Sequence, residues 1–260
     1  MSSEFASNEP RIALVTGACS GIGEAMALSL GRSGYHVVVS DLSLDAAQLV
    51  SDLIQTAGGM ATALKLDVSD QSAIDSVVSQ FPNIDILVNN AGIQYVAKLE
   101  SFPADMWRKL NDVLLVGPAM LTRAVLPGMK SRDFGRIINV GSIHAHVASP
   151  YKSAYVAAKH GLIGFSKVVA LETAQHNITI NTLCPSYVKT PLVEKQIALQ
   201  AAEHGISEDE VINKIMLEPM PKKAFISFEE LTASMHFLIS DAAKNMTGQS
   251  LVIDGGWTIK

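Results

Sequence analysis

Three residues of the sequence have side chains that could carry acid–base chemistry at a hydroxyl group: Ser142, Tyr155 and Lys159. Tyr155 and Lys159 are four positions apart in a stretch with a helical pattern, so the phenol and the ammonium group share one face of that helix. A neighbouring positive charge favours the phenolate and so lowers the pKa of a tyrosine, which is about 10 in a free residue. The same spacing also occurs in ordinary amphipathic helices, so the chemistry depends on the elements that position the pair.

The elements around these residues alternate between short apolar runs and longer helical patterns. Strands are predicted at 11–16, 35–40, 61–66, 84–89, 136–140, 178–183 and 251–253, and helices at 21–32, 44–56, 106–129 and 151–175. Most of the strands are continuously apolar, which is typical of a parallel sheet covered by helices on both faces. We therefore predict an α/β fold with a doubly wound, Rossmann-type parallel sheet, which binds ligands at the carboxyl ends of its strands.

The chain is expected to form one domain over residues 11–260 after a flexible N-terminal segment, 1–10, because no repeat or low-complexity linker divides it. The segment at about 187–221 is different, since it has helical patterns at 191–204 and 207–216 but no strand. We predict that this segment is a helical lid over the substrate site. The alternative is an inert surface insertion.

Composition and charge exclude several classes of protein. Hydrophobic residues make up 48% and charged residues 17% of the chain, which argues against disorder. The net charge is −5 without a long run of Lys or Arg, so no nucleic-acid partner is predicted. The two cysteines, Cys19 and Cys184, lack metal-ligand or redox spacing, so we expect free thiols and no metal. No signal-peptide pattern and no apolar run of ~18 residues is present, so we predict a cytoplasmic location without membrane contact.

A glycine-rich segment, 16–23, follows the first predicted strand and opens the first predicted helix. Glycines permit a tight turn there, and they let backbone N–H groups approach a pyrophosphate at the positive end of the helix. The position between strand and helix makes the pattern more specific than glycine spacing alone. The residues expected to hold a dinucleotide in this segment are Gly17, Ser20, Gly21, Ile22 and Gly23.

An acidic residue at the end of the second strand indicates which dinucleotide is bound. Asp41 lies 20 residues after Gly21, where a carboxylate accepts hydrogen bonds from ribose hydroxyls and repels a 2′-phosphate. Leu42 follows it, so no basic residue stands beside it, and NAD is predicted rather than NADP. A helix N-cap is the alternative role, although Ser43 is better placed for it. The residues at later strand ends that are expected to line the same crevice are Asp67, Val68, Asn89, Ala91 and Gly92.

In combination, these motifs resemble the short-chain dehydrogenase/reductase family. The residues that carry the resemblance are 16–23, 89–92, Ser142, 155–159, 185–190 and 254–256, in order along nearly the whole chain. The resemblance implies that Tyr155 is the general base in alcohol oxidation and the acid in the reverse reaction, and that Ser142 orients the carbinol oxygen. It implies that Lys159 holds the nicotinamide ribose and lowers the pKa of Tyr155. The cofactor contacts that it implies are Tyr155, Lys159, Pro185, Val188 and Thr190.

A second group of residues is suited to hold one small carboxylate. Lys152 precedes Tyr155 by three positions on the same helix face, and His144 follows Ser142 by two. Amide donors come from Gln94, after the fourth strand, and from Gln196 in the predicted lid. Tyr187 and Trp257 are expected to wall a small methyl end.

Within the family, the stretches 90–96, 142–155, 190–196 and 255–258 resemble members that oxidise (R)-3-hydroxybutyrate to acetoacetate. That resemblance implies an NAD-dependent oxidation of a small carboxylate-bearing 3-hydroxy acid, and a homotetramer as the assembly. Two other functions remain open. One is reduction of 3-oxoacyl groups on a carrier protein, which Asp41 and the acidic net charge disfavour.

The other open function is that of a catalytically silent NAD-binding sensor or scaffold, and one departure from the family pattern favours it. Leu114 stands where the family usually has an asparagine that supports a proton relay, with Asn111 one turn earlier. Either Asn111 and water rebuild the relay or turnover is impaired. A smaller departure is Ser186, where a glycine usually follows the proline.

Overall fold

The apolar runs form one parallel sheet in the computed structural model, which describes residues 9–259. Its strands are β1 (Ile12–Thr16), β2 (His36–Asp41), β3 (Met60–Lys65), β4 (Ile84–Asn89), β5 (Gly135–Val140), β6 (Ile178–Pro185) and β7 (Ser250–Ile253). The order across the sheet is β3-β2-β1-β4-β5-β6-β7, so β2 and β3 lie on one side of β1 and the later strands lie on the other. The predicted doubly wound parallel sheet is confirmed. Such sheets bind ligands where the strand order reverses, which here is between β1 and β4.

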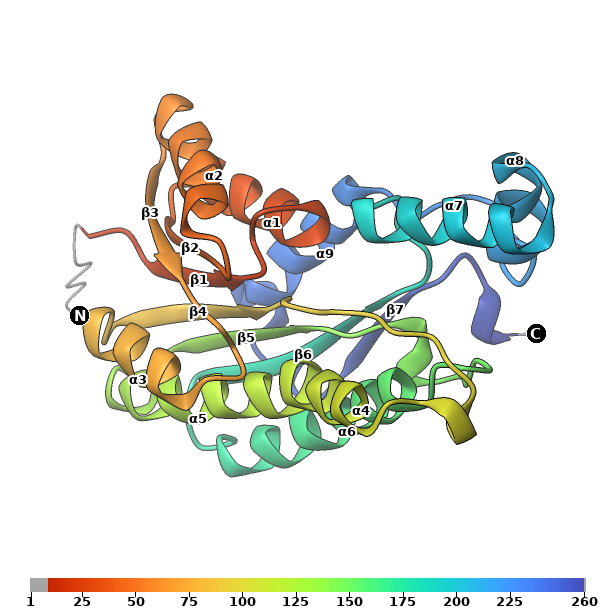
Figure 1. Cartoon of the computed structure of the whole chain (residues 1–260). Helices are drawn as coiled ribbons and strands as arrows, with labels where there is room; N and C mark the ends of the chain where they lie inside the picture. The colour runs from red at the N-terminus through yellow and green to blue at the C-terminus, as the bar shows by residue number, and fades with distance from the viewer. Residues whose placement is uncertain (1–8, 260) are drawn as a thin grey trace.

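Helices cover both faces of the sheet (Figure 1). One face carries α1 (Gly21–Arg32), α2 (Leu44–Thr56) and α9 (Phe228–Ile239). The other carries α3 (Gln71–Gln80), α4 (Ala104–Asn111), α5 (Gly117–Ser131) and α6 (Ser153–Glu172). Neighbouring strand residues point to opposite faces, so Val15 packs in the first layer whereas Leu14 packs in the second.

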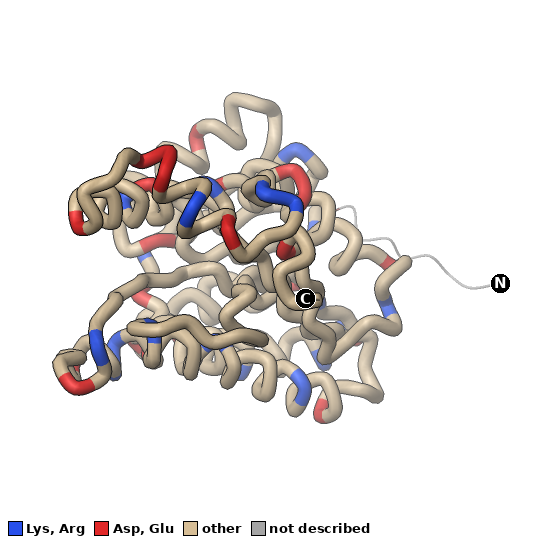
Figure 2. Tube along the Cα trace, turned by 90° about the vertical axis from the view of Figure 1, so that its right-hand side faces the viewer, with Lys and Arg blue, Asp and Glu red and all other residues tan. Residues whose placement is uncertain are grey.

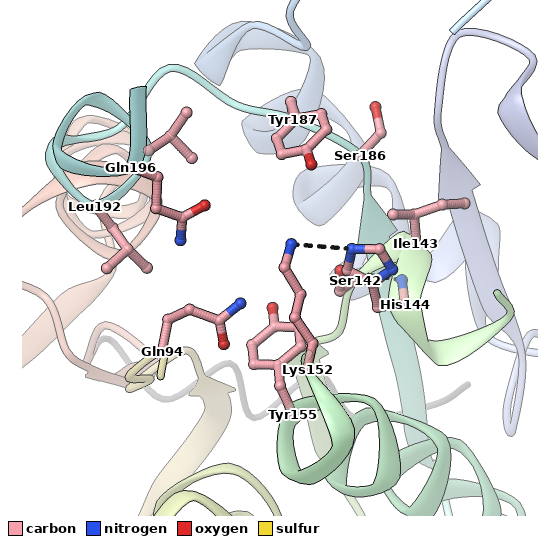
Figure 3. Close-up of a pocket in the computed structure, with 11 residues that line it drawn as sticks. Gln94, Ser142, Ile143, His144, Lys152, Tyr155, Ser186, Tyr187, Leu192 and Gln196 are labelled. Carbon is pink, nitrogen blue, oxygen red and sulfur yellow. Dashed lines mark hydrogen bonds between the residues drawn. The ribbon is translucent and has the colours of Figure 1, made fainter. Parts of the chain in front are cut away.

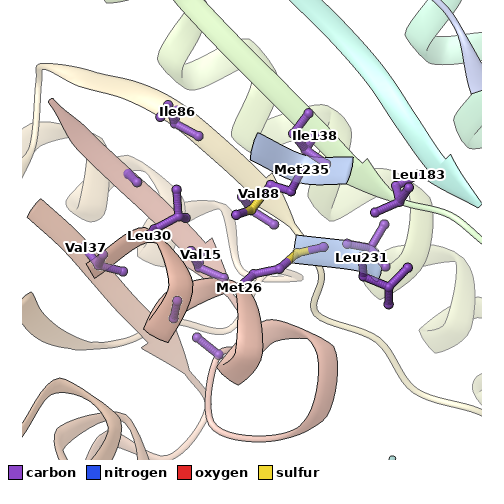
Figure 4. Packing of buried hydrophobic residues seen from close by; sticks show 14 of the residues in the cluster. Val15, Met26, Leu30, Val37, Ile86, Val88, Ile138, Leu183, Leu231 and Met235 are labelled. Atoms are coloured by element: carbon purple, nitrogen blue, oxygen red, sulfur yellow. The ribbon is translucent and has the colours of Figure 1, made fainter. Parts of the chain in front are cut away.

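The layer beneath α1 and α9 is a fully buried apolar cluster (Figure 4). Met26 and Leu30 of α1 pack there against strand residues such as Val88. Met235 of α9 belongs to the same cluster. Burial of one such side chain stabilises the fold by roughly 1.5–3 kcal/mol. This packing fixes the sheet, and hence the positions of the loops that leave its carboxyl edge.

The helix predicted at 106–129 is interrupted in the structure. A π-helical turn, Asp112–Val116, separates α4 from α5, and Gly117 follows it. A β-carbon on Gly117 would lie 2.6 Å from the carbonyl oxygen of Val68, so only glycine allows α5 to approach the sheet this closely. Ala104–Ser131 is, within the described residues, the one stretch long and apolar enough to cross a membrane, but its buried face packs on the sheet.

The segment predicted as a lid contains α7 (Pro191–His204), α8 (Glu208–Val211) and a π-helical turn, Ile212–Met216. Thr190 caps α7 by accepting a hydrogen bond from the N–H of Val193, and Gly205 ends it with a φ of 64°. Figure 1 shows these helices extending beyond the carboxyl edge of the sheet. Their predicted bounds agree with the structure, and their movement as a lid remains a prediction.

Candidate active site

Two adjoining hollows open at the carboxyl edge of the sheet. The larger has a volume of about 450 Å³ and extends from the glycine-rich loop to Lys159. The smaller has a volume of about 90 Å³ and lies between α6 and α7. Both are lined by Ser142 and Tyr155, so these two residues stand where the contents of the two hollows would meet.

The glycine-rich loop brings the start of α1 to the larger hollow. Ser20 is the N-cap of α1, yet its side chain makes no capping hydrogen bond, so the first N–H groups of the helix are not satisfied by it. Gly17 has a φ of 61°, and a β-carbon there would lie 2.7 Å from the α-carbon of Ala91. This tight turn beside a helix N-terminus fits the pyrophosphate of a dinucleotide.

Asp41 places a negative charge at the far end of the larger hollow. Its carboxylate accepts hydrogen bonds from the backbone N–H of Cys19 at 3.2 Å and of Leu42 at 2.8 Å. Ser43, not Asp41, caps α2, as the sequence indicates. Burial, followed by the effect of Asp41, raises the pKa of the Cys19 thiol to about 12, so this cysteine stays protonated. The carboxylate is therefore held in place with nothing cationic paired to it among residues 9–259.

Most residues predicted to contact a cofactor line the larger hollow. Those found there are Gly17, Ser20, Gly21, Ile22, Asp41, Asp67, Val68, Ala91, Gly92, Tyr155, Lys159, Pro185, Val188 and Thr190. Gly23 and Asn89 do not line it. Gly23 lies against the backbone of Gly17, and the amide of Asn89 is buried and donates to Asn139 at 2.8 Å.

Asn90, which belongs to the 89–92 motif but was not among the predicted cofactor contacts, lines the hollow in place of Asn89. Its amide donates to the carbonyl oxygens of Thr16 at 3.0 Å and Gly17 at 2.9 Å. These bonds tie the end of β4 to the glycine-rich loop. The signal that could have found Asn90 is its position just past the strand, where a side chain is free to cross to the neighbouring loop.

The three residues with acid–base chemistry converge as predicted. Lys159, 5% exposed, donates from Nζ to the carbonyl oxygen of Val140 at 2.6 Å, so α6 is anchored to the end of β5. The same Nζ lies 5.7 Å from the centre of the Tyr155 ring. Burial lowers the pKa of Lys159 to about 8. A hydrogen bond joins Tyr155 to Ser142, which begins the loop after β5.

In the protein alone, the pKa of Tyr155 is raised and not lowered. Burial raises the pKa of the phenol, and the hydrogen bond with Ser142 lowers it by less. The lowering predicted from Lys159 is therefore smaller than the cost of burying a phenolate. Further positive charge is needed in the larger hollow before the phenolate is favoured, and a lowered pKa of Tyr155 with a nicotinamide dinucleotide bound there stays a prediction.

The side of α6 that packs against α4 is apolar. Leu114, 1% exposed, packs with Leu110, Ala158 and the ring of Tyr155. The amide of Asn111 donates to the carbonyl oxygen of Trp107 at 2.9 Å, along its own helix, and Asn111 lines neither hollow. A relay rebuilt from Asn111 is therefore not formed by the side chains described.

The smaller hollow contains five of the six residues predicted to bind substrate (Figure 3). These come from four separate segments of the chain and are Gln94, His144, Lys152, Tyr187 and Gln196. Trp257 does not line the hollow. It stacks on Tyr187, with 5.9 Å between the ring centres, and so supports the part of the wall that Tyr187 forms. The lining residues that sequence reasoning missed are Ile143, Ser186, Leu192 and Val193.

Charge in the smaller hollow is concentrated on Lys152. Its Nζ lies 3.5 Å from Nε2 of His144, as Figure 3 shows. Burial, and then the charge of Lys152, lower the pKa of His144 to about 4, so the imidazole is neutral near pH 7 and can accept from the ammonium. Oε1 of Gln94 is buried with no hydrogen-bond partner within residues 9–259. An ammonium with free amide groups around it is suited to one carboxylate.

Comparisons with known proteins agree with this geometry. Residues 11–201 match the family model described as short chain dehydrogenase. The D-beta-hydroxybutyrate dehydrogenase of Rhizobium meliloti is 43% identical over 95% of this chain and 98% of its own. The enzyme of the same name from Cupriavidus necator is also 43% identical, over 95% and 97% of the two chains.

More distant similarities cover the chain equally well. The 3-oxoacyl-[acyl-carrier-protein] reductase of Escherichia coli is 34% identical over 95% of this chain and 97% of its own. A crystal structure of an actinorhodin polyketide ketoreductase variant with NADPH superimposes with a TM-score of 0.89. It is 30% identical and covers 95% of this chain and 97% of that chain.

Proposed function

Because this chain belongs to the short-chain dehydrogenase family, we propose that it catalyses the reversible, NAD-dependent oxidation of (R)-3-hydroxybutyrate to acetoacetate. The observation that carries this proposal is the adjacency of the two hollows. Ser142 and Tyr155 stand at their junction, and Lys152 lies on the side of the smaller hollow. A substrate with its hydroxyl at the junction and its carboxylate beside Lys152 would be a short 3-hydroxy acid.

The choice of NAD rests on Asp41. The larger hollow fits a dinucleotide because its glycines leave room for a close approach, while a 2′-phosphate would meet the Asp41 carboxylate. The polyketide ketoreductase similar to this chain was solved with NADPH, so similarity of fold does not choose between the two cofactors. Leu42 offers no positive charge to offset repulsion of a phosphate by Asp41.

Ser142, Tyr155 and Lys159 have separate roles in the proposed reaction. A nicotinamide dinucleotide held in the larger hollow would supply the hydride acceptor and positive charge in the hollow that Tyr155 lines. Ser142 donates a hydrogen bond to the carbinol oxygen, and the phenolate of Tyr155 accepts its proton. Lys159 stabilises that phenolate and, anchored on Val140, keeps α6 against the end of β5.

The small volume of the second hollow supports a compact substrate. At about 90 Å³ it is well below the roughly 300–1,000 Å³ of sites for drug-sized ligands. Leu192 and Val193 supply its aliphatic surface, and Lys152 supplies its charge. A long acyl chain would have to leave this hollow past α7.

Reduction of carrier-bound 3-oxoacyl groups is the second enzyme activity to test, because relatives with that name are 34% identical. An acidic carrier protein would require a basic surface around the entrance. Figure 2 shows Lys and Arg interspersed with Asp and Glu on the face that looks onto the carboxyl edge of the sheet. This mixed surface favours a free acid. We also propose a homotetramer, which sedimentation analysis would test, and a cytoplasmic location, which cell fractionation would test.

The decisive experiment is an activity matrix. Purified protein is assayed at 340 nm with NAD and NADP against (R)- and (S)-3-hydroxybutyrate, and in reverse against acetoacetate and a 3-oxoacyl carrier-protein substrate. We expect turnover with NAD and the (R) acid. Tyr155→Phe should reduce kcat about a hundred- to ten-thousandfold yet still bind NADH, measured by fluorescence titration, because the phenyl ring keeps the packing. Activity only with NADP and a carrier substrate would overturn the proposal.

A further inference from the structure

The buried carboxylate of Asp254, just after β7, lines neither hollow. Both of its oxygens accept hydrogen bonds from the residues that follow. Oδ1 accepts from the backbone N–H of Gly256 at 2.8 Å, and Oδ2 accepts from the N–H and the hydroxyl of Thr258 at 2.8 and 2.7 Å. Three hydrogen bonds to one charged group therefore hold the turn 254–258 closed.

The turn needs this restraint because its backbone is flexible in sequence. Gly255 and Gly256 have φ values of 60° and 91°, in the left-handed region that glycine enters easily. The N–H of Lys222 donates to the carbonyl oxygen of Gly255 at 3.1 Å and so fixes the start of the turn. Among residues 9–259, the side-chain hydrogen bonds of 256–258 are all made with Asp254.

Trp257, inside the turn, contacts two residues that line the smaller hollow. Its ring stacks on Tyr187 with 28° between planes, and it meets the His144 imidazole edge-on, with 5.9 Å between ring centres in both pairs. The ammonium of Lys152 lies 3.5 Å from Nε2 of His144 and 5.9 Å from the centre of the Tyr187 ring (Figure 3). Trp257 therefore supports both of the rings that lie beside the ammonium.

We propose that Asp254 is a positioning residue for the substrate carboxylate, acting through Trp257. This inference rests on the proposed function. Loss of the Asp254 charge would release the turn, and Trp257 would no longer hold the rings of His144 and Tyr187. The ammonium of Lys152 would then lose its fixed direction. Binding of the hydroxy acid should be weakened more than the chemical step, because Asp254 contacts neither the acid–base residues nor the dinucleotide hollow.

Asp254→Asn tests this role because an amide keeps the size of the carboxylate but has one acceptor oxygen instead of two. KM for (R)-3-hydroxybutyrate at saturating NAD should rise about tenfold, as expected for loss of a hydrogen bond to a charged group. Both kcat and KM for NAD should change little. Thr258→Val removes only the hydroxyl that donates to Asp254, so it should fold even if Asp254→Asn does not, and should raise the same KM about threefold.

Asp85→Asn is the matched control. Asp85 is also a half-buried carboxylate that accepts from a backbone N–H, that of Ile12 at 3.1 Å, but it lies near the start of β4, at the opposite edge of the sheet. This variant should lower the free energy of unfolding and leave KM for the acid unchanged.

A double-mutant cycle separates positioning from a general loss of stability. Trp257→Ala should raise KM for the acid by itself. If Asp254 acts through Trp257, adding Asp254→Asn to this variant should change KM by less than about twofold. Two effects that multiply would overturn the role of Asp254 as a positioning residue.

A measurement without substrate distinguishes this inference from the proposed function. Burial holds the pKa of His144 at about 4, so release of Trp257 would admit water and raise the midpoint of the His144 titration, followed by NMR, toward its ordinary value in Asp254→Asn. An unchanged KM together with an unchanged midpoint would overturn the positioning role alone. Wild type that oxidises no 3-hydroxy acid would overturn the proposed function, and a raised His144 midpoint in Asp254→Asn would still support the positioning of this wall.

Discussion

Lys152 and His144 form an unusual pair because a half-buried ammonium lies against a buried base, and only the ammonium is charged. The neutral imidazole accepts from the ammonium, which leaves the ammonium as the positive charge of the hollow. Burial lowers the pKa of Lys152 as well, so a carboxylate beside it would restore the preference for the charged form. Substrate binding and the ionisation of this pair are therefore coupled.

Replacement of the ammonium tests its role as the carboxylate anchor. Lys152→Met keeps the aliphatic stem but removes a charge-assisted hydrogen bond, so KM for (R)-3-hydroxybutyrate should rise about ten- to a hundredfold, while KM for NAD stays constant. Steady-state kinetics at saturating NAD measure the effect. Lys195→Met, on the exposed side of α7, is the matched control and should change neither constant. Equal KM values in wild type and Lys152→Met would remove Lys152 from the site.

His144 should make the folded state sensitive to acid. Its pKa is about 4 when folded against 6.5 ordinarily, so between pH 6.5 and 4 the unfolded chain binds a proton that the folded chain does not. The free energy of unfolding therefore falls as the pH drops through this window, on the order of 2 kcal/mol at pH 5.

Urea denaturation at pH 7.5 and pH 5, at constant protein concentration, measures this loss. His144→Gln cannot take up the proton and should lose about 2 kcal/mol less than wild type over this interval. His204→Gln, at the exposed end of α7, should behave as wild type. An identical pH dependence for His144→Gln and wild type would show that the imidazole is already charged in the fold.

The site residues that sequence reasoning placed correctly are those whose position follows from local geometry. The spacing from Tyr155 to Lys159 fixes a common helix face whatever the helix packs against. Asn89 and Asn90 show the opposite case, because neighbouring side chains at a strand end point in different directions and a shift of one residue exchanges their roles. Trp257 was placed near the hollow, but no pattern shows that Tyr187 lies in front of it.

At the scale of elements, boundaries were predictable where a cap or a glycine sets them. The bounds of α1 and α7 agree with prediction, and α7 has Thr190 before it and Gly205 after it. The helices α3 and α9 were not predicted, although Asp70 caps the first and Ser227 begins a capping box for the second. The π-helical turn at 112–116 ends at Gly117, whose close contact with Val68 is a tertiary effect that no local pattern contains.

The glycine-rich loop should tolerate no side chain at Gly23. A β-carbon there would overlap the Asn90 amide and the carbonyl oxygen of Gly17, so the loop and the end of β4 would have to separate. Gly23→Ala should therefore raise KM for NAD at least tenfold and lower the free energy of unfolding by about 1–3 kcal/mol. Gly34→Ala provides the comparison, because its β-carbon would meet nothing within 4 Å.

Gly34 has a φ of 85°, so its substitution should cost about 1–2 kcal/mol from backbone strain alone. Because it lies at the opposite edge of the sheet, KM for NAD should remain at the wild-type value. Kinetics and urea denaturation on the same samples separate the two variants. A normal KM for NAD in Gly23→Ala would mean that the loop does not need this contact to bind the cofactor.

At the scale of the whole molecule, the apolar core is divided into parts that differ in size. Two large clusters fill the layers on either side of the sheet. The segment with α7 and α8 has a cluster of its own, formed by Ile197, Val211 and Met216. Val188, Leu217 and Met220, near the two ends of the segment, belong to one of the sheet clusters, so the segment is attached at its base while α7 and α8 pack on each other. This division allows the segment to open without unfolding of the sheet.

Two buried isoleucines test whether the segment opens separately. Ile197→Ala, in α7, and Ile138→Ala, in β5, each remove a side chain that is at most 3% exposed, and each should cost about 2–5 kcal/mol where it acts. Hydrogen exchange should accelerate only across α7 and α8 in the first variant, with KM for the hydroxy acid raised because Gln196 is displaced. In the second, exchange should accelerate throughout the sheet. Uniform acceleration in Ile197→Ala would show that the segment is part of a single cooperative unit and does not act as a lid.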